Sequence, residues 1–208
     1  MNQANPMESS EATDKAAAMA AIRREIEQLT ESPLYEYRTA NGYQPVIGAG
    51  SLDAAIVFIG EAPGKQEALT GQPFVGASGR VLDELLAGVG LSREEVYITN
   101  VVKDRPPNNR DPRPAEIALY SPFLVRQLAI IQPRVIAPLG RFAMDFTLNL
   151  FHLPQAGDKI SQLHGQPIPA RTSYGEIKIV PLYHPAVALY QRPKLQTLED
   201  DFRRLIEE

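Results

Sequence analysis

The chain contains no cysteine among its 208 residues. Disulfide bonds, thiolate zinc sites and cysteine-ligated clusters are therefore excluded. The chain also lacks an apolar run long enough to cross a membrane, and its polar N-terminus lacks the basic stretch and apolar core of a secretion signal. We expect a cytoplasmic protein, and the length suits one well-buried α/β domain.

The chain also has no excess of positive charge, since its formal net charge is −4. This value argues against a nonspecific polyelectrolyte binder, although a local basic stripe is enough to hold a short run of phosphates. The sequence has two such stripes. The first comprises Lys103, Arg105, Arg110 and Arg113, and the second comprises Arg192 and Lys194. Each stripe could equally be an ordinary solvated loop.

Hydrophobic periodicity predicts alternating strands and helices. Residues 1–14 are small and polar and are expected to form a disordered tail ahead of a single domain over 15–208. Short apolar runs predict buried strands at 55–59, 96–102, 134–139 and 177–182. Helical spacing predicts helices near 15–29, 81–89, 115–131, 142–150 and 195–207, with a loop and a hairpin-like excursion over 152–176. The alternation indicates a three-layer α/β/α sandwich with a central, mostly parallel four-stranded sheet.

Ligands of such sheets bind outside the carboxyl ends of the strands. Chemically capable residues follow three of the four predicted strands. The first strand leads into a loop, 60–67, whose glycines and proline favour a rigid turn with backbone N–H groups free to meet a carbonyl or an anion. The spacing of a phosphate loop and of a dinucleotide fingerprint is absent, and an ordinary tight turn is the simpler interpretation of this loop alone.

Two further side chains stand at similar positions. Asn100 ends an apolar strand, and its planar amide can accept from N3–H and donate to O4 of uracil, whereas cytosine presents the reverse pattern. His184 follows the last strand, and nothing spaces the three histidines as metal ligands, so we expect a structural residue, a general acid or an electrophile. Phe74, flanked by proline and by glycine at position 76, is either a core residue or a platform on which a flat ring can stack.

Together these segments resemble the uracil-DNA glycosylase superfamily, and family 4 in particular. The motifs that carry the resemblance are GEAPG (60–64), TGQPFVG (70–76), YITNVVKDRPPNNR (97–110), PLG (138–140) and HPA (184–186). They occur in the family's order, and the resemblance runs from about Ile47 to the C-terminus. It implies a glycosylase that hydrolyses the N-glycosidic bond of uracil in DNA and leaves an abasic site.

The resemblance also implies roles for individual residues. The backbone of Glu61 and Ala62 would bind uracil O2, Phe74 would stack on the flipped base, and Asn100 would contact N3 and O4. His184 would stabilise the negative charge that grows on O2 as the bond breaks.

Two carboxylates and the basic stripes complete the expected site. Glu67 matches the family position beside C5 of uracil, where a side chain would exclude the methyl group of thymine. Either Glu61 or Glu67 would orient the attacking water, and the sequence does not decide between them. The loop after His184, which contains Leu189, Tyr190, Gln191 and Arg192, would fill the gap in the duplex. The residues expected to contact DNA are Lys103, Arg105, Arg110, Leu189, Arg192 and Lys194.

One departure from family 4 concerns its iron–sulfur cluster. Members of that family ligate a [4Fe–4S] cluster through four cysteines, and their positions fall here near Pro33, Glu36, Asp104 and Tyr120. None of these side chains is a cluster ligand, so we expect no iron, no other metal and no cofactor. We expect the tyrosines to fill the space instead as one aromatic cluster, comprising Tyr35, Tyr37, Tyr43 and Tyr120.

Other functions stay open at this point. A non-catalytic relative that binds uracil or damaged DNA is one alternative, and a glycosylase for another base, such as hypoxanthine or mismatched thymine, is a second. A nucleotide-metabolising α/β enzyme is disfavoured because no phosphate cradle is present. The expected substrate is uracil-containing DNA, single- or double-stranded, and the expected state is a monomer.

Overall fold

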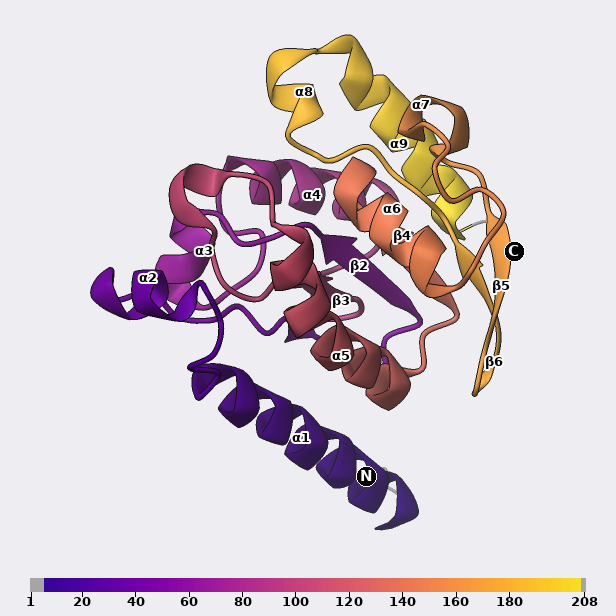
Figure 1. Cartoon of the computed structure of the whole chain (residues 1–208). Coiled ribbons are helices and arrows are strands. Elements are labelled where there is room, and N and C mark those ends of the chain that lie inside the picture. Colours follow the sequence, from indigo (N-terminus) through magenta and orange to yellow (C-terminus); the bar gives the residue numbers. More distant parts are fainter. Residues whose placement is uncertain (1–5, 207–208) are drawn as a thin grey trace.

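The computed structural model describes residues 6–206. Its centre is one sheet with the strand order β1-β3-β2-β4-β6-β5 (Figure 1). The inner four strands, β3, β2, β4 and β6, are parallel to one another. The strands are β1 Ala49–Gly50, β2 Ile56–Gly60, β3 Tyr97–Asn100, β4 Val135–Pro138, β5 Ile168–Thr172 and β6 Gly175–Ile179.

The four predicted strands are confirmed, but the sheet has six strands rather than the predicted four. β1 joins β3 and β5 joins β6, both antiparallel, at the two edges. β1 has only two residues and contains Gly50, so no apolar run marks it. β5 lies in the predicted 152–176 excursion, and buried and exposed residues alternate along most of its length. Edge strands with one solvated face lack the continuous apolar run on which the prediction rested.

Helices cover both faces of the sheet and confirm the three-layer sandwich. The side chain of Phe58 in β2 points to one face and stacks on Phe202, with 5.6 Å between the ring centroids. Val57 and Ile59, the neighbours of Phe58, belong to the core of the other face, because side chains alternate along a strand. The first face carries α4 Ala77–Gly88, α8 Val187–Tyr190 and α9 Pro193–Ile206, and the second carries α1 Pro6–Glu27, α5 Pro114–Ile131 and α6 Arg141–Leu150.

Shorter helices lie between these elements. They are α2 Tyr35–Ala40, α3 Lys65–Thr70, the 3₁₀ helix η1 Pro107–Asn109 and α7 Ile160–Leu163. Helix α1, the indigo helix in Figure 1, lies alongside α5 and contributes Ile22 and Ile26 to the core. It begins at Pro6, inside the stretch 1–14 for which we predict a disordered tail. Residues 1–5 lie outside the described residues, and the division into a tail and one domain stays a prediction.

Candidate active site

The residues that the sequence analysis assigned to uracil come together in one cavity at the carboxyl ends of the parallel strands. The cavity has a volume of about 360 Å³. All six predicted recognition and catalytic residues line it: Glu61, Ala62, Glu67, Phe74, Asn100 and His184. Asn109 and Arg110, from the loop after β3, line it too. A role for Asn109 was not predicted. Its position within the motif over 97–110 was the only feature of the sequence that pointed to the cavity.

Asn100 and Gly60 end neighbouring strands and lie side by side in the sheet register. Asn100 is only 2% exposed, and its side-chain amide makes no hydrogen bond within the part of the chain that the structure describes. The residue lines the cavity, so its unpaired amide is available to a ligand that pairs with it. A Cβ atom at Gly60 would lie 2.3 Å from Oδ1 of Asn100 and 2.8 Å from the Phe74 ring, so only glycine leaves this side of the cavity open.

Phe74 also lines the cavity, and it lies on the loop between α3 and α4. Its ring stacks on the ring of His184, with 5.6 Å between centroids and 29° between planes. The residue has a φ of 52°, which non-glycine residues seldom adopt. Phe74 packs into the core under α4 and also lines the cavity. It is therefore a core residue whose ring is also open to a stacking partner.

Glu67 in α3 holds the same loop. One oxygen of its carboxylate, Oε1, accepts the backbone N–H groups of Val75 at 2.9 Å and of Gly76 at 2.8 Å. The sequence does not indicate these contacts, because they join residues eight and nine positions apart in a loop without a regular pattern. Glu67 therefore lines the cavity and at the same time ties α3 to the loop that bears Phe74.

His184 is an electrically neutral side chain in this cavity. Burial lowers the pKa of His184 to about 4, an effect that the nearby carboxylate of Glu67 only partly offsets. The backbone N–H of Ala186 donates to Nδ1 of His184 at 3.2 Å. Nδ1 is then an acceptor, so the neutral imidazole carries its proton on Nε2. Among the described residues no group of three or more His, Cys, Asp or Glu side chains could hold a metal ion.

Glu61 is a carboxyl group whose protonation changes near neutral pH. Burial raises the pKa of Glu61 to about 7, and Asp111 adds to this rise, whereas Arg141 opposes it. A group with such a pKa is suited to exchange a proton with a reacting molecule. The arrangement thus offers an amide for a base edge, an aromatic face, a neutral imidazole donor and one titratable carboxyl group.

The predicted DNA contact by Lys103 is wrong. Its side chain is 0% exposed and cannot reach a phosphate. The ammonium group donates to Oγ1 of Thr99 at 2.7 Å, to the carbonyl of Asn100 at 2.7 Å and to Oε1 of Gln127 at 2.6 Å. Burial lowers the pKa of Lys103 well below its usual value. The lysine follows an apolar strand and precedes a polar loop, and this position suggested exposure.

The other predicted DNA-contacting residues lie at the surface or at the rim of the cavity. Arg105 donates to Oδ1 of Asn109 at 2.7 Å and to the hydroxyl of Tyr43 at 2.8 Å. Nζ of Lys194 lies 4.1 Å from the ring centroid of Tyr183, directly before His184. Arg110, at the cavity rim, pairs with Glu116, and Arg192 is exposed, as is Leu189 in α8. Their contact with DNA stays a prediction.

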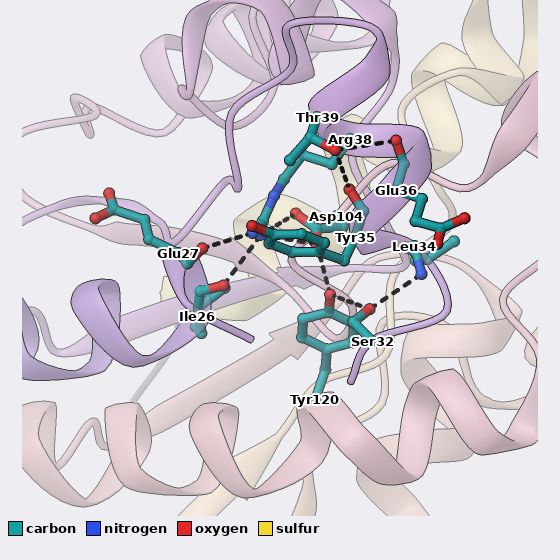
Figure 2. Close-up of polar contacts among 10 residues, drawn as sticks. All are labelled: Ile26, Glu27, Ser32, Leu34, Tyr35, Glu36, Arg38, Thr39, Asp104 and Tyr120. Carbon is teal, nitrogen blue, oxygen red and sulfur yellow. Dashed lines mark hydrogen bonds and ion pairs between the residues drawn. The ribbon is translucent and has the colours of Figure 1, made fainter. Parts of the chain in front are cut away.

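A polar network occupies the region of the expected cluster positions (Figure 2). Asp104 is fully buried, and both of its oxygens accept from Nη1 of Arg38, at 3.1 and 3.0 Å. The hydroxyl of Tyr120 donates to Asp104 at 2.6 Å and lies 2.8 Å from Oγ of Ser32. A cluster does not fit here, because Asp104 and Tyr120 are engaged with each other and Pro33 and Glu36 are exposed.

The predicted aromatic cluster is wrong. Tyr120 is buried, but its hydroxyl belongs to the polar network described above. Tyr37 and Tyr43 pack edge to face, with 5.9 Å between centroids, and both hydroxyls accept from Arg105. Tyr35 lies under the guanidinium group of Arg38 (Figure 2). The pair of Arg38 and Asp104 ties the N-terminal segment to the chain after β3, and the hydroxyl of Tyr120 joins α5 to this pair.

Comparisons with known proteins agree with this arrangement. A family model described as "Uracil DNA glycosylase superfamily" matches residues 47–208. The chain is 46% identical over 184 residues to the type-4 uracil-DNA glycosylase of Archaeoglobus fulgidus, covering 88% of this chain and 89% of that protein. It is 41% identical over 190 residues to the type-4 enzyme of Thermotoga maritima, covering 90% and 88%. The type-5 uracil-DNA glycosylase of Pyrobaculum aerophilum is 30% identical, covering 84% and 81%. None of the described helices is long and apolar enough to span a membrane.

Proposed function

The chain belongs to the uracil-DNA glycosylase superfamily, and from this premise we propose that it flips uracil out of DNA and hydrolyses its N-glycosidic bond. The observation that supports this most is the convergence of Asn100, Phe74 and His184 in one cavity. The product is an abasic site and free uracil. The protein acts as a monomer in the cytoplasm and needs no metal or other cofactor.

Recognition depends on the buried amide of Asn100. Its oxygen accepts N3–H of uracil and its NH₂ group donates to O4, whereas cytosine would leave both groups unpaired. Buried groups left unpaired discriminate strongly against the wrong ligand. Stacking on Phe74 returns about 1–3 kcal/mol against the few kcal/mol needed to extrude the base. Glu67 borders the cavity where it would crowd the methyl group of thymine.

Hydrolysis requires one water and one displaced base. The bond between C1′ and N1 breaks, its electron pair moves onto uracil, and His184 donates a hydrogen bond from Nε2 to the developing charge on O2, with the backbone N–H groups of Glu61 and Ala62. A fixed donor of this kind contributes roughly 3–4 kcal/mol in other enzymes. The ionised carboxylate of Glu61 accepts a proton from the water whose oxygen bonds to C1′, and uracil then takes up a proton.

The remaining surface residues hold the DNA. Four basic residues contact phosphates on both sides of the cavity: Arg105, Arg110, Arg192 and Lys194. Leu189 on α8 fills the gap that the flipped base leaves. Lys103 is not part of this surface. Its hydrogen bond to the carbonyl of Asn100 supports the strand end from inside the protein.

A cleavage assay tests the proposal. A labelled single-stranded oligonucleotide with one uracil is incubated with the protein and treated with alkali, which cuts at abasic sites. Strand scission should vanish in Asn100→Ala and His184→Ala, and persist in the control Asn149→Ala, which alters an exposed asparagine on α6. Tight binding without release of any base would favour a non-catalytic relative. A second oligonucleotide, with one hypoxanthine in place of uracil, tests the other specificity, and scission there but not at uracil would favour it.

A further inference from the structure

The loop that carries Phe74 is held in an unfavourable conformation. Phe74 has a φ of 52°, in the left-handed region, where bulky side chains remain only if their surroundings hold them. The loop also packs tightly against the first turn of α4. A Cβ atom at Gly79 would lie 1.7 Å from the carbonyl oxygen of Phe74, so the loop has no space to relax toward the helix.

Arg93 contacts the carbonyl side of this turn. It lies between α4 and β3, and its guanidinium group donates to the carbonyl oxygens of Pro73 at 3.0 Å, of Phe74, and of Gly79 at 3.5 Å. Nε of Arg93 also donates to the carboxylate of Asp83 in α4, and this ion pair orients the guanidinium plane. A planar group with several donors in a rigid fork holds these carbonyl groups in one fixed geometry, whereas the donors of a lysine have no such fork.

Glu67 contacts the other side of the same turn. It accepts the N–H groups of Val75 and Gly76, the two residues that follow Phe74. The peptide groups before and after Phe74 are therefore bound by charged side chains of opposite sign. Hydrogen bonds to charged groups are stronger than those between neutral groups. The two side chains together account for the persistence of the strained turn.

We propose that Arg93 is a positioning residue for uracil excision, which acts by holding Phe74 in the left-handed conformation that places its ring beside His184 and Asn100. This inference rests on the proposed function. Arg93 is not among the residues that line the uracil cavity, so it does not touch the base and acts only through Phe74. Displacement of a stacking group by about 1 Å is enough to lower a rate by roughly 100-fold.

A double-mutant cycle with Arg93→Met and Phe74→Ala tests this mode of action. Single-turnover kcat/KM on uracil-containing single-stranded DNA should fall about 10- to 100-fold in Arg93→Met. In the Phe74→Ala background the same substitution should change kcat/KM by less than about twofold, because Arg93 acts only by positioning the ring that this background lacks. The affinity for DNA without uracil should not change. Arg126→Met, which breaks an exposed ion pair with Glu25, is the matched control and should have wild-type kinetics.

Additive effects of the two substitutions would overturn the inference, as would unchanged kinetics in Arg93→Met. If Arg93→Met does not fold, Arg93→Lys replaces it in the cycle, since it keeps the charge and loses the fork.

Amide hydrogen exchange gives a readout that needs no activity. Peptides covering 73–79 should exchange faster in Arg93→Met than in the wild type or Arg126→Met, with β2 unchanged. If the wild type releases no uracil, the proposed function fails, and with it the role of Arg93 as a positioning residue for excision. Faster exchange in Arg93→Met would then support only the conformational coupling between Arg93 and Phe74. Unchanged exchange would overturn the coupling itself.

Discussion

The backbone N–H of Ala186 donates to Nδ1 of His184 at 3.2 Å. This bond places the single proton of the neutral imidazole on Nε2. Burial also lowers the pKa of His184 to about 4, so the ring stays neutral throughout the physiological range. His184 is therefore set to act as a neutral hydrogen-bond donor, and its titration does not contribute to the pH dependence of activity near neutrality.

Glu61 should control activity near neutral pH. Its raised pKa of about 7 means that the carboxyl group is protonated below this pH and ionised above it. Only the ionised form can accept a proton from water, so kcat/KM should rise about tenfold per unit below pH 7 and level off above it. Glu61→Gln should lower the plateau and remove the slope. If the slope persists in that variant, Glu61 is not the acceptor. Single-turnover assays between pH 5.5 and 9 measure both profiles.

Gly60→Ala should remove uracil excision while the protein stays folded. The added Cβ atom would lie 2.3 Å from Oδ1 of Asn100 and 2.8 Å from the Phe74 ring, so the base-reading groups must move. We expect kcat/KM to fall by about 100-fold or more. Gly88→Ala, which adds the same atom into open space at the end of α4, serves as the control and should have normal activity. Near-normal activity of Gly60→Ala would show that the cavity is not the site of reaction.

Stability should depend on the buried pair of Arg38 and Asp104. Asp104→Ala leaves the buried guanidinium group without its carboxylate and should lower the free energy of unfolding by about 3–5 kcal/mol. Tyr120→Phe removes the hydrogen bonds to Asp104 and Ser32 and should cost about 1–3 kcal/mol. Urea denaturation measures both values. Tyr190→Phe, at a side chain that is 85% exposed, should leave the free energy unchanged. Equal stability of all three variants would contradict a structural role for the network.

The salt dependence of DNA binding should separate Lys103 from Lys194. A lysine that contacts a phosphate releases a counterion, so Lys194→Met should reduce the slope of log K against log salt by about 0.7 on single-stranded DNA. Lys103→Met should leave this slope unchanged, because Lys103 is buried. Fluorescence anisotropy titrations at several salt concentrations give the slopes. A reduced slope in Lys103→Met would mean that the lysine reaches the DNA after all.

The sequence alone determined the four parallel strands and the residues gathered at their ends. Buried parallel strands favour continuous apolar runs, and their carboxyl ends meet at one edge of the sheet, so Glu61, Asn100 and His184 could be placed together without coordinates. The lack of cysteine likewise excluded a thiolate-ligated cluster, because no other side chain replaces that ligand set.

Only the tertiary structure decided which polar residues are buried and what they bind. Arg38 and Asp104 are 66 positions apart, and Arg93 lies 19 positions after Phe74, yet each pair is joined by hydrogen bonds. Lys103 follows an apolar strand and precedes a polar loop in sequence, but its ammonium group points inward to Gln127 on α5. Such contacts depend on how helices pack against the sheet. Local periodicity records which face of an element is apolar, and it carries no information about which distant polar group completes a buried hydrogen bond.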